Sequence, residues 1–140
     1  DRYGKSATAM IIGSLRAFAV HMTFAYTMIS PYLPVILLGI AFSLVPAAMW
    51  PSMVKLVKES RIGTAYGIMY SVQNLGLWGI PLLAGIILDK TNPGNPLVAD
   101  YTMTILMFAG LGLVGLLFSL LLKFEDKRKA FGIELPLNQK

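Results

Sequence analysis

Residues 62–88 read IGTAYGIMYSVQNLGLWGIPLLAGIIL and contain no Asp, Glu, Lys or Arg. Two further stretches, residues 17–54 and 101–122, also lack all four of these residue types. A helix needs about 20 apolar residues to cross the hydrocarbon core of a bilayer. Residues 17–54 are too many for one crossing and are interrupted at Ser30-Pro31-Tyr32. Together with the residues before position 17, they provide two membrane crossings. The chain is therefore predicted to cross a membrane four times.

Composition supports an all-α membrane protein. Of the 140 residues, 56% are hydrophobic and 14% are charged, whereas soluble domains carry about 25% charged residues. Backbone that faces lipid must satisfy its own hydrogen bonds, which favours helices over open sheets. We expect transmembrane helices at residues 7–28, 33–54, 63–88 and 102–122.

The basic residues in the connecting segments predict the orientation, because Lys and Arg collect in cytoplasmic loops. Ten of the 12 basic residues lie in residues 1–6, in residues 55–61 and in the tail at 123–140, and the loop between the last two spans has only Lys90. Both termini are therefore predicted to be cytoplasmic. The placement of basic residues in cytoplasmic loops accounts for the net charge of +5. Nucleic acid is therefore not expected as a partner.

The tail at 123–140 is polar and contains Gly132 and Pro136. Residues 125–140 are expected to be too polar and too broken to pack and to form a disordered cytoplasmic end, with attraction of the basic residues 127–129 to anionic lipid headgroups as the alternative.

The third span has the most polar face. Tyr66, Tyr70, Gln73 and Asn74 are spaced to share one side of a helix, and unpaired amides in hydrocarbon are costly. These side chains either join neighbouring helices or form the polar wall of a substrate path. Trp50, between Pro46 and Pro51 in the second span, is either part of the same path at a proline kink or an interfacial anchor.

The first span contains Arg16 and His21. A charge within a membrane is costly and is taken as functional by default, so this pair is a candidate intramembrane polar or proton site. A neutral, hydrogen-bonded His21 is the alternative, and none of the four spans offers Arg16 an acidic partner.

No enzymatic site is expected. The chain has one histidine, no cysteine and no carboxylate within a span, so no catalytic set, metal site or cofactor site is predicted. Gly110, Gly112 and Gly115 spell a dinucleotide-binding pattern, but that pattern requires a preceding strand and a following helix. Within a membrane span, these glycines favour close approach of a neighbouring helix. Further small-residue stripes are Gly39, Ser43 and Ala47, and Gly63, Gly67, Ser71 and Gly79.

The first five residues, Asp1-Arg2-Tyr3-Gly4-Lys5, resemble the signature loop of the major facilitator superfamily. Ser6 departs from the motif by replacing its last basic residue. The resemblance implies that the four spans are helices nine to twelve of a twelve-helix transporter, whose missing N-terminal part is then a partner of this segment. It also implies that Asp1, Arg2, Gly4 and Lys5 form a gating loop, in which Asp1 latches to a helix start in the opposite half.

A second set of residues is similar to the branch of lysosomal dipeptide uniporters and their bacterial relatives. The matching blocks are Ala48-Met49-Trp50-Pro51, Gly63-Thr64-Ala65-Tyr66-Gly67, Gln73-Asn74-Leu75-Gly76-Leu77 and Ala84-Gly85-Ile86-Ile87-Leu88-Asp89. The resemblance implies alternating access, with the second span lining the cavity, the third at the interface between halves, and the first and fourth outside. Arg16 is unusual for an outer helix.

We therefore expect a secondary transporter of a small solute, such as a dipeptide or an amino-acid-like compound, that works without a cofactor. It is expected in a bacterial inner membrane by default, or in a lysosomal membrane if the source is an animal. One alternative, a four-helix multidrug exporter, needs a membrane-embedded carboxylate that the spans lack. The other is a non-transporting scaffold that associates through its small-residue helix faces.

Overall fold

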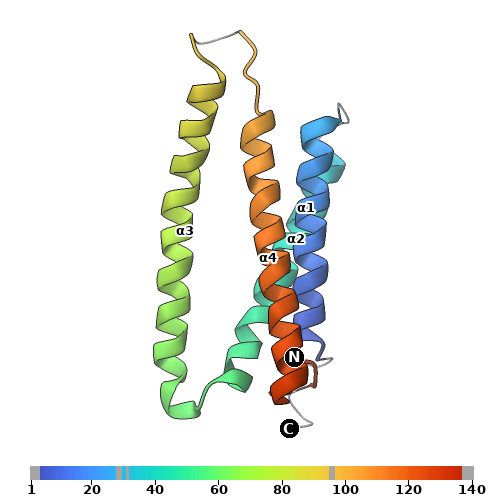
Figure 1. Cartoon of the computed structure of the whole chain (residues 1–140), viewed down its shortest axis with the longest axis vertical. Coiled ribbons are helices and arrows are strands. Elements are labelled where there is room, and N and C mark those ends of the chain that lie inside the picture. Colours follow the sequence, from blue (N-terminus) through green and yellow to red (C-terminus); the bar gives the residue numbers. More distant parts are fainter. Residues whose placement is uncertain (1–3, 28–29, 31, 95–96, 137–140) are drawn as a thin grey trace.

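The computed structural model describes residues 4–27, 30, 32–94 and 97–136. Within these residues the chain forms four long α-helices, one short 3-10 turn and no strand (Figure 1). The elements are α1 at Ser6–Tyr26, α2 at Tyr32–Leu56, η1 at Glu59–Arg61, α3 at Ile62–Thr91 and α4 at Thr102–Lys129. All four helices are long and apolar enough to cross a membrane. The prediction of an all-α membrane protein with four spans is confirmed.

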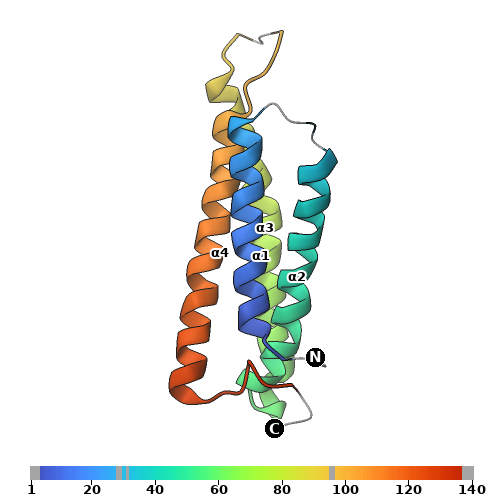
Figure 2. The same ribbon diagram turned by 90° about the vertical axis from the view of Figure 1, so that its right-hand side faces the viewer.

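Helix α1 packs against both α2 and α4, and Figure 2 shows it between them. Glycines permit the close contact. A Cβ atom on Gly112 of α4 would lie 3.0 Å from the backbone nitrogen of Phe18, and one on Gly13 of α1 would lie 2.7 Å from Cγ2 of Val45. The sequence interpretation of the α4 glycines as helix-approach positions is confirmed for Gly112 and for Gly115, whose Cβ would lie 3.2 Å from Ser14 Oγ.

Helix α3 stands apart from this three-helix bundle (Figure 1). It has no buried residue, and Cβ atoms built on Gly63, Gly67 and Gly79 would meet nothing within 4 Å. Its apolar side chains are open as well, with Trp78 71% exposed. The predicted small-residue stripe on this helix thus has no partner within the described part of the chain.

Helix α4 continues seven residues past the expected end of the fourth span at Leu122 and ends at Lys129. Ion pairs along the added turns favour the helical conformation: the Glu125 carboxylate lies 3.3 Å from Arg128 Nη1 and 2.9 Å from Lys129 Nζ. The residue after the helix, Ala130, has a left-handed φ of 51°.

The next residues, 130–136, fold back across the end of the bundle and are named here the C-terminal strap (Figure 2). Ile133 within the strap is fully buried, so the prediction that the tail does not pack is wrong for these residues. The physical reason is that side chains from α2 and α4 form hydrogen bonds with the backbone N–H and carbonyl groups of the strap. Asp126 accepts the N–H groups of Ile133 and Glu134 at 3.0 and 3.3 Å. Lys55 donates to the carbonyl oxygens of Ile133 and Leu135 at 3.3 and 2.6 Å. Residues 137–140 lie outside the described residues.

The loop between α3 and α4, at the opposite end, is joined by Asn92 and Asp100. The Asn92 side chain donates to the Asp100 carbonyl at 2.9 Å and accepts the Asp100 N–H at 2.6 Å. The Asp100 carboxylate accepts the Thr102 N–H at 2.9 Å, one of the first N–H groups of α4, which have no acceptor within the helix. Hydrogen bonds from the Thr102 side chain and backbone lower the pKa of the Asp100 carboxyl below its usual value.

Candidate functional site

Three aromatic side chains that the sequence placed on the candidate substrate path come together between α2 and α3. The ring of Trp50 stacks on Tyr66 with centroids 5.4 Å apart and lies 4.6 Å from the ring of Tyr70. The Tyr66 hydroxyl donates a hydrogen bond to the Trp50 carbonyl oxygen at 3.0 Å. Tyr66 and Tyr70 are one helical turn apart, so both reach the same neighbour. We call these three residues the aromatic cluster.

The aromatic cluster is partly open. Tyr70 is 53% exposed, and Trp50 and Tyr66 are half-buried. Trp50 lies between Pro46 and Pro51, both inside α2. Each proline lacks the N–H that an α-helix would use at that position, so this part of α2 lacks two internal backbone hydrogen bonds. The cluster therefore presents aromatic faces and phenol groups beside the proline-containing turns of a membrane helix.

The two amides of the predicted path, Gln73 and Asn74, continue along α3 from the cluster. Both are exposed. The Asn74 amide donates to the Tyr70 carbonyl oxygen at 2.8 Å, within its own helix. Among the described residues, no hydrogen bond joins either amide to another helix. Within this part of the chain the two amides are therefore not interhelical contacts.

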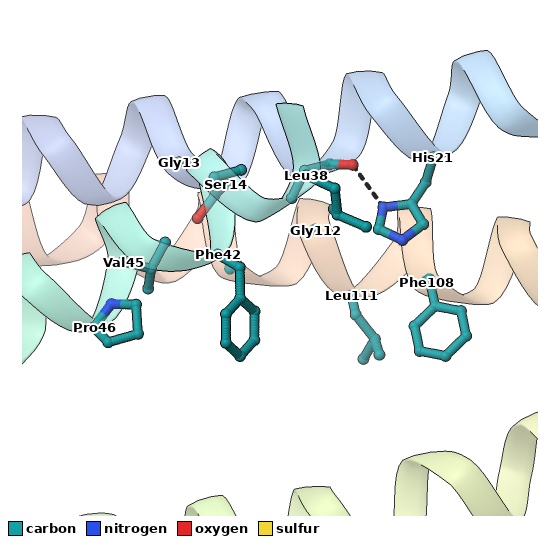
Figure 3. A pocket seen from close by; sticks show the side chains of 13 residues that line it. Gly13, Ser14, His21, Leu38, Phe42, Val45, Pro46, Phe108, Leu111 and Gly112 are labelled. Atoms are coloured by element: carbon teal, nitrogen blue, oxygen red, sulfur yellow. Dashed lines mark hydrogen bonds between the residues drawn. The ribbon is translucent and has the colours of Figure 1, made fainter. Parts of the chain in front are cut away.

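His21 lies in a different place, a cavity of about 320 Å³ formed by α1, α2 and α4. Its Nδ1 lies 2.7 Å from the Ala17 carbonyl oxygen, and its ring stacks on Phe108 with centroids 5.7 Å apart (Figure 3). Because a carbonyl oxygen only accepts, Nδ1 carries the proton of that hydrogen bond. The side chains of Phe42, Leu111 and Phe108 point to the side of the cavity that faces α3 (Figure 3).

Arg16 does not share the His21 cavity. It lines a separate groove between α1 and α2, together with Val20, Thr23, Leu37 and other residues, and it is exposed. Arg16 and His21 are five positions apart, which turns their side chains to different sides of α1. The structure therefore does not bring the two predicted members of the intramembrane polar site together.

The gating loop is described only at Gly4 and Lys5, since Asp1 and Arg2 lie outside the described residues. Both described residues have left-handed backbone, with φ of 66° and 58°. The Lys5 N–H donates to the Glu134 carbonyl oxygen at 2.9 Å. A Cβ atom on Gly4 would lie 2.5 Å from the same oxygen, so only glycine fits there beside the strap.

Sequence reasoning missed the polar residues that surround this loop. The Glu134 carboxylate accepts the Thr8 N–H at 2.9 Å and the Thr8 hydroxyl at 2.7 Å. Lys123 donates to the same hydroxyl at 2.6 Å and lies 3.9 Å from Glu134. The sequence signal that was available is Ile133 between Gly132 and Glu134, an apolar residue followed by an acidic one in a polar tail.

Comparison with known proteins identifies the family. Residues 1–134 match the Major Facilitator Superfamily. The chain belongs to this superfamily. The resemblance of the sequence to this superfamily is thereby confirmed.

Curated relatives within this superfamily carry the name lysosomal dipeptide transporter MFSD1. The chicken (Gallus gallus) protein is 42% identical over 89 residues, which cover 64% of this chain and 20% of the relative. The human (Homo sapiens) protein is 42% identical over 90 residues, which cover 64% and 19%. The zebrafish (Danio rerio) protein is 33% identical over 135 residues, which cover 96% and 28%. The chain thus spans between a fifth and somewhat over a quarter of the length of these superfamily members.

Proposed function

We propose that this chain is part of a secondary transporter that moves a dipeptide or a similar amino-acid-like solute across a membrane by alternating access. The carrying observation is the identity of 33–42% to proteins named as lysosomal dipeptide transporters, which extends over up to 96% of the chain. In alternating access, two helical halves rock around a central site that opens to each side in turn. The chain supplies four helices of one half.

The aromatic cluster and the two amides are the proposed substrate-path residues. A dipeptide carries an ammonium group, an amide and a carboxylate. Aromatic faces attract ammonium groups, while phenol and amide side chains donate and accept hydrogen bonds with peptide and carboxylate groups. Trp50, Tyr66, Tyr70, Gln73 and Asn74 offer these groups along one line from α2 onto α3. Within the described chain Tyr70, Gln73 and Asn74 are exposed, and the other two side chains are half-buried. This accessibility supports the role, because a substrate must reach these residues.

The proposed orientation has both termini in the cytoplasm. Helix α1 begins and α4 ends at the same end of the bundle (Figure 1). In the sequence, ten of the 12 basic residues belong to the segments 1–6, 55–61 and 123–140. The gating loop would then face the cytoplasm, where Asp1 would latch to the positive end of a helix in the other half. If transport is coupled to protons, His21 is the candidate carrier of these helices, because acidic residues occur only at their ends and in the connections.

Transport by the full-length protein in proteoliposomes tests the proposal. Uptake of a labelled dipeptide is expected, and Asn74→Ala is expected to raise the half-saturation concentration about tenfold, the cost of roughly one hydrogen bond to a charged group. The matched control is Ser71→Ala, which also removes a hydrogen bond to the carbonyl four residues earlier on α3. Unchanged uptake by the Asn74 variant removes this residue from the path.

A scaffold without transport activity is the second candidate, and one observation favours it. The small residues Gly39, Gly63, Gly67 and Gly79 have nothing within 4 Å of a built Cβ, so these faces are free to receive another helix. The two candidates differ in one measurement. A folded, reconstituted full-length protein that takes up neither dipeptides nor amino acids supports the scaffold.

A further inference from the structure

The C-terminal strap closes the end of the bundle at which the gating loop lies. It leaves α4 at Ala130, passes the start of α1 and reaches the end of α2 (Figure 2). Ile133 has no exposed surface, so the strap is packed and does not merely rest on the bundle. Three helices and the gating loop each contribute a hydrogen bond to it.

The contact with α1 is a helix cap supplied from the other end of the chain. The first N–H groups of a helix have no acceptor within the helix, and α1 has neither a side-chain cap at Lys5 nor an acidic residue in its first turn. Glu134 supplies the missing acceptor for the first turn of α1. Its carboxylate accepts both the N–H and the hydroxyl of Thr8, 126 residues earlier, and its negative charge is favourable at a helix N-terminus.

The contacts with α2 and α4 use two buried charged residues. Lys55 at the end of α2 is 6% exposed and Asp126 on α4 is 7% exposed. Lys55 donates to two strap carbonyls, and Asp126 accepts two strap N–H groups. Buried charges are costly unless they are paired and hydrogen-bonded. Removing the strap would leave both charges without these bonds, so the end of α2 is joined to α4 through it.

The same strap sets the conformation of the gating loop. The Glu134 carbonyl accepts the Lys5 N–H, and the backbone of residues 134–136 occupies the space that a Cβ of Gly4 would need. Lys5 is held with a positive φ of 58°, a left-handed conformation that is unfavourable for a non-glycine residue. Such a conformation persists only where its surroundings impose it, and the strap is what lies against it.

We propose that Glu134 is a positioning residue of the transport cycle: through the strap it fixes Gly4 and Lys5 of the gating loop and joins the ends of α1, α2 and α4 into one moving body. Glu134 is not proposed to touch substrate. The expected effect of Glu134 on transport rests on the proposed function. The structural part of the inference, the fixing of the loop by Glu134, is tested without any substrate.

The first experiment is hydrogen exchange in the full-length protein in detergent. In Glu134→Ala, amides of residues 5–9 and of the strap are expected to exchange about tenfold faster, since both segments lose the same hydrogen bonds. Glu134→Gln keeps an acceptor for Thr8 and is expected to restore most of the protection. The matched control is Glu59→Ala, which removes an exposed carboxylate from η1.

Two results of the exchange experiment would overturn the inference. One is unchanged exchange of residues 5–9 in Glu134→Ala, and the other is an equal acceleration in Glu59→Ala. If Glu134→Ala does not fold, Thr8→Ala replaces it, because it removes only the hydroxyl contacts with Glu134 and Lys123. It is expected to accelerate exchange in the strap to a smaller extent, and no acceleration there would reject the role of Glu134.

The second experiment separates positioning from a purely structural role. In proteoliposomes, Glu134→Ala is expected to lower the maximal rate of dipeptide uptake about threefold or more, since conformational steps set many turnover rates. The half-saturation concentration is expected to stay unchanged, and Glu134→Gln to recover the rate. Lost protection with an unchanged maximal rate would overturn the positioning role. A wild-type protein that carries no dipeptide would overturn the proposed substrate, while the exchange experiment still decides whether Glu134 fixes the gating loop.

Discussion

Helices α1 and α3 are both membrane spans, yet they differ in where their packing partners lie. Helix α1 buries residues against α2 and α4 along its length, and glycines at the crossing points bring the backbones together. Helix α3 buries none of its residues, and its glycines face open space. Hydropathy does not separate the two, because both are apolar enough to span a bilayer. Membrane insertion and helix packing are therefore specified by different residues.

The largest effect is expected where α1 meets α4. A Cβ on Gly112 would lie 3.0 and 3.2 Å from the backbone N and Cα of Phe18, and the backbone cannot yield as a side chain can. Gly112→Leu is expected to destabilise the full-length protein by about 1–3 kcal/mol through overpacking. Thermal unfolding in detergent measures this. Gly110→Leu is the control, since Gly110 has nothing within 4 Å, and equal effects of the two variants would contradict the helix contact.

The next largest effect is expected at Gly4, where the C-terminal strap lies against the gating loop. Gly4→Ala forces a Cβ into a left-handed position and to 2.5 Å from the Glu134 carbonyl oxygen. Gly94→Ala is the matched control, because Gly94 is also left-handed, with φ of 77°, but has nothing within 4 Å. Left-handed strain costs about 1–2 kcal/mol in both. Gly4→Ala is expected to lower the unfolding temperature further, and to accelerate hydrogen exchange in the strap. Identical behaviour would show that the strap exerts no constraint.

A smaller effect is expected where α3 is tied to α2. Tyr66→Phe removes the hydrogen bond to the Trp50 carbonyl oxygen and keeps the ring stacking. The expected loss is about 0.5–1.5 kcal/mol, measured by denaturant titration of the full-length protein. Tyr32→Phe serves as the control, because Tyr32 is 80% exposed. A loss well above this range would mean that α3 depends on this one bond more than its geometry indicates.

The smallest effect is expected at the loop between α3 and α4. The pKa of Asp100 is lowered by its hydrogen bonds with Thr102, so its charged form stabilises the fold. That contribution is present above the usual value of 3.8 and is lost as the pH falls through the lower folded pKa. Asp100→Ala is therefore expected to unfold at a slightly lower temperature than wild type at neutral pH, with the difference vanishing in acid. Asp89→Ala is the control, and a difference that grows in acid would reverse the assignment.

Sequence reasoning predicted the spans because a charge-free run of sufficient length reports directly on the solvent around a helix. It also placed Tyr66 and Tyr70 on one face, since that spacing is fixed by the helical repeat. It did not distinguish Gly110 from Gly112, which belong to the same motif but differ in whether they face Phe18. That difference depends on the rotation of α4 about its axis, which neighbouring helices decide.

The strap was not predictable by the same reasoning. Thr8 and Glu134 are 126 residues apart, and neither has a local pattern that names the other. The polar composition of the tail predicts an unpacked segment. Polar composition is a reliable guide only when the polar groups of a segment have no hydrogen-bond partners in the fold. Asp126 and Lys55 supply those partners. Arg16 and His21 illustrate the opposite error, since proximity in sequence grouped two residues that occupy separate cavities.

The cap that Glu134 places on α1 also has a consequence for biosynthesis. A ribosome delivers Thr8 long before Glu134, so the first turn of α1 acquires its acceptor only when residue 134 has emerged. A nascent chain that stopped after Lys129 would contain all four helices and still leave that turn without its acceptor. Such a chain would also lack Ile133, so the surface of the bundle that this buried side chain covers would stay open.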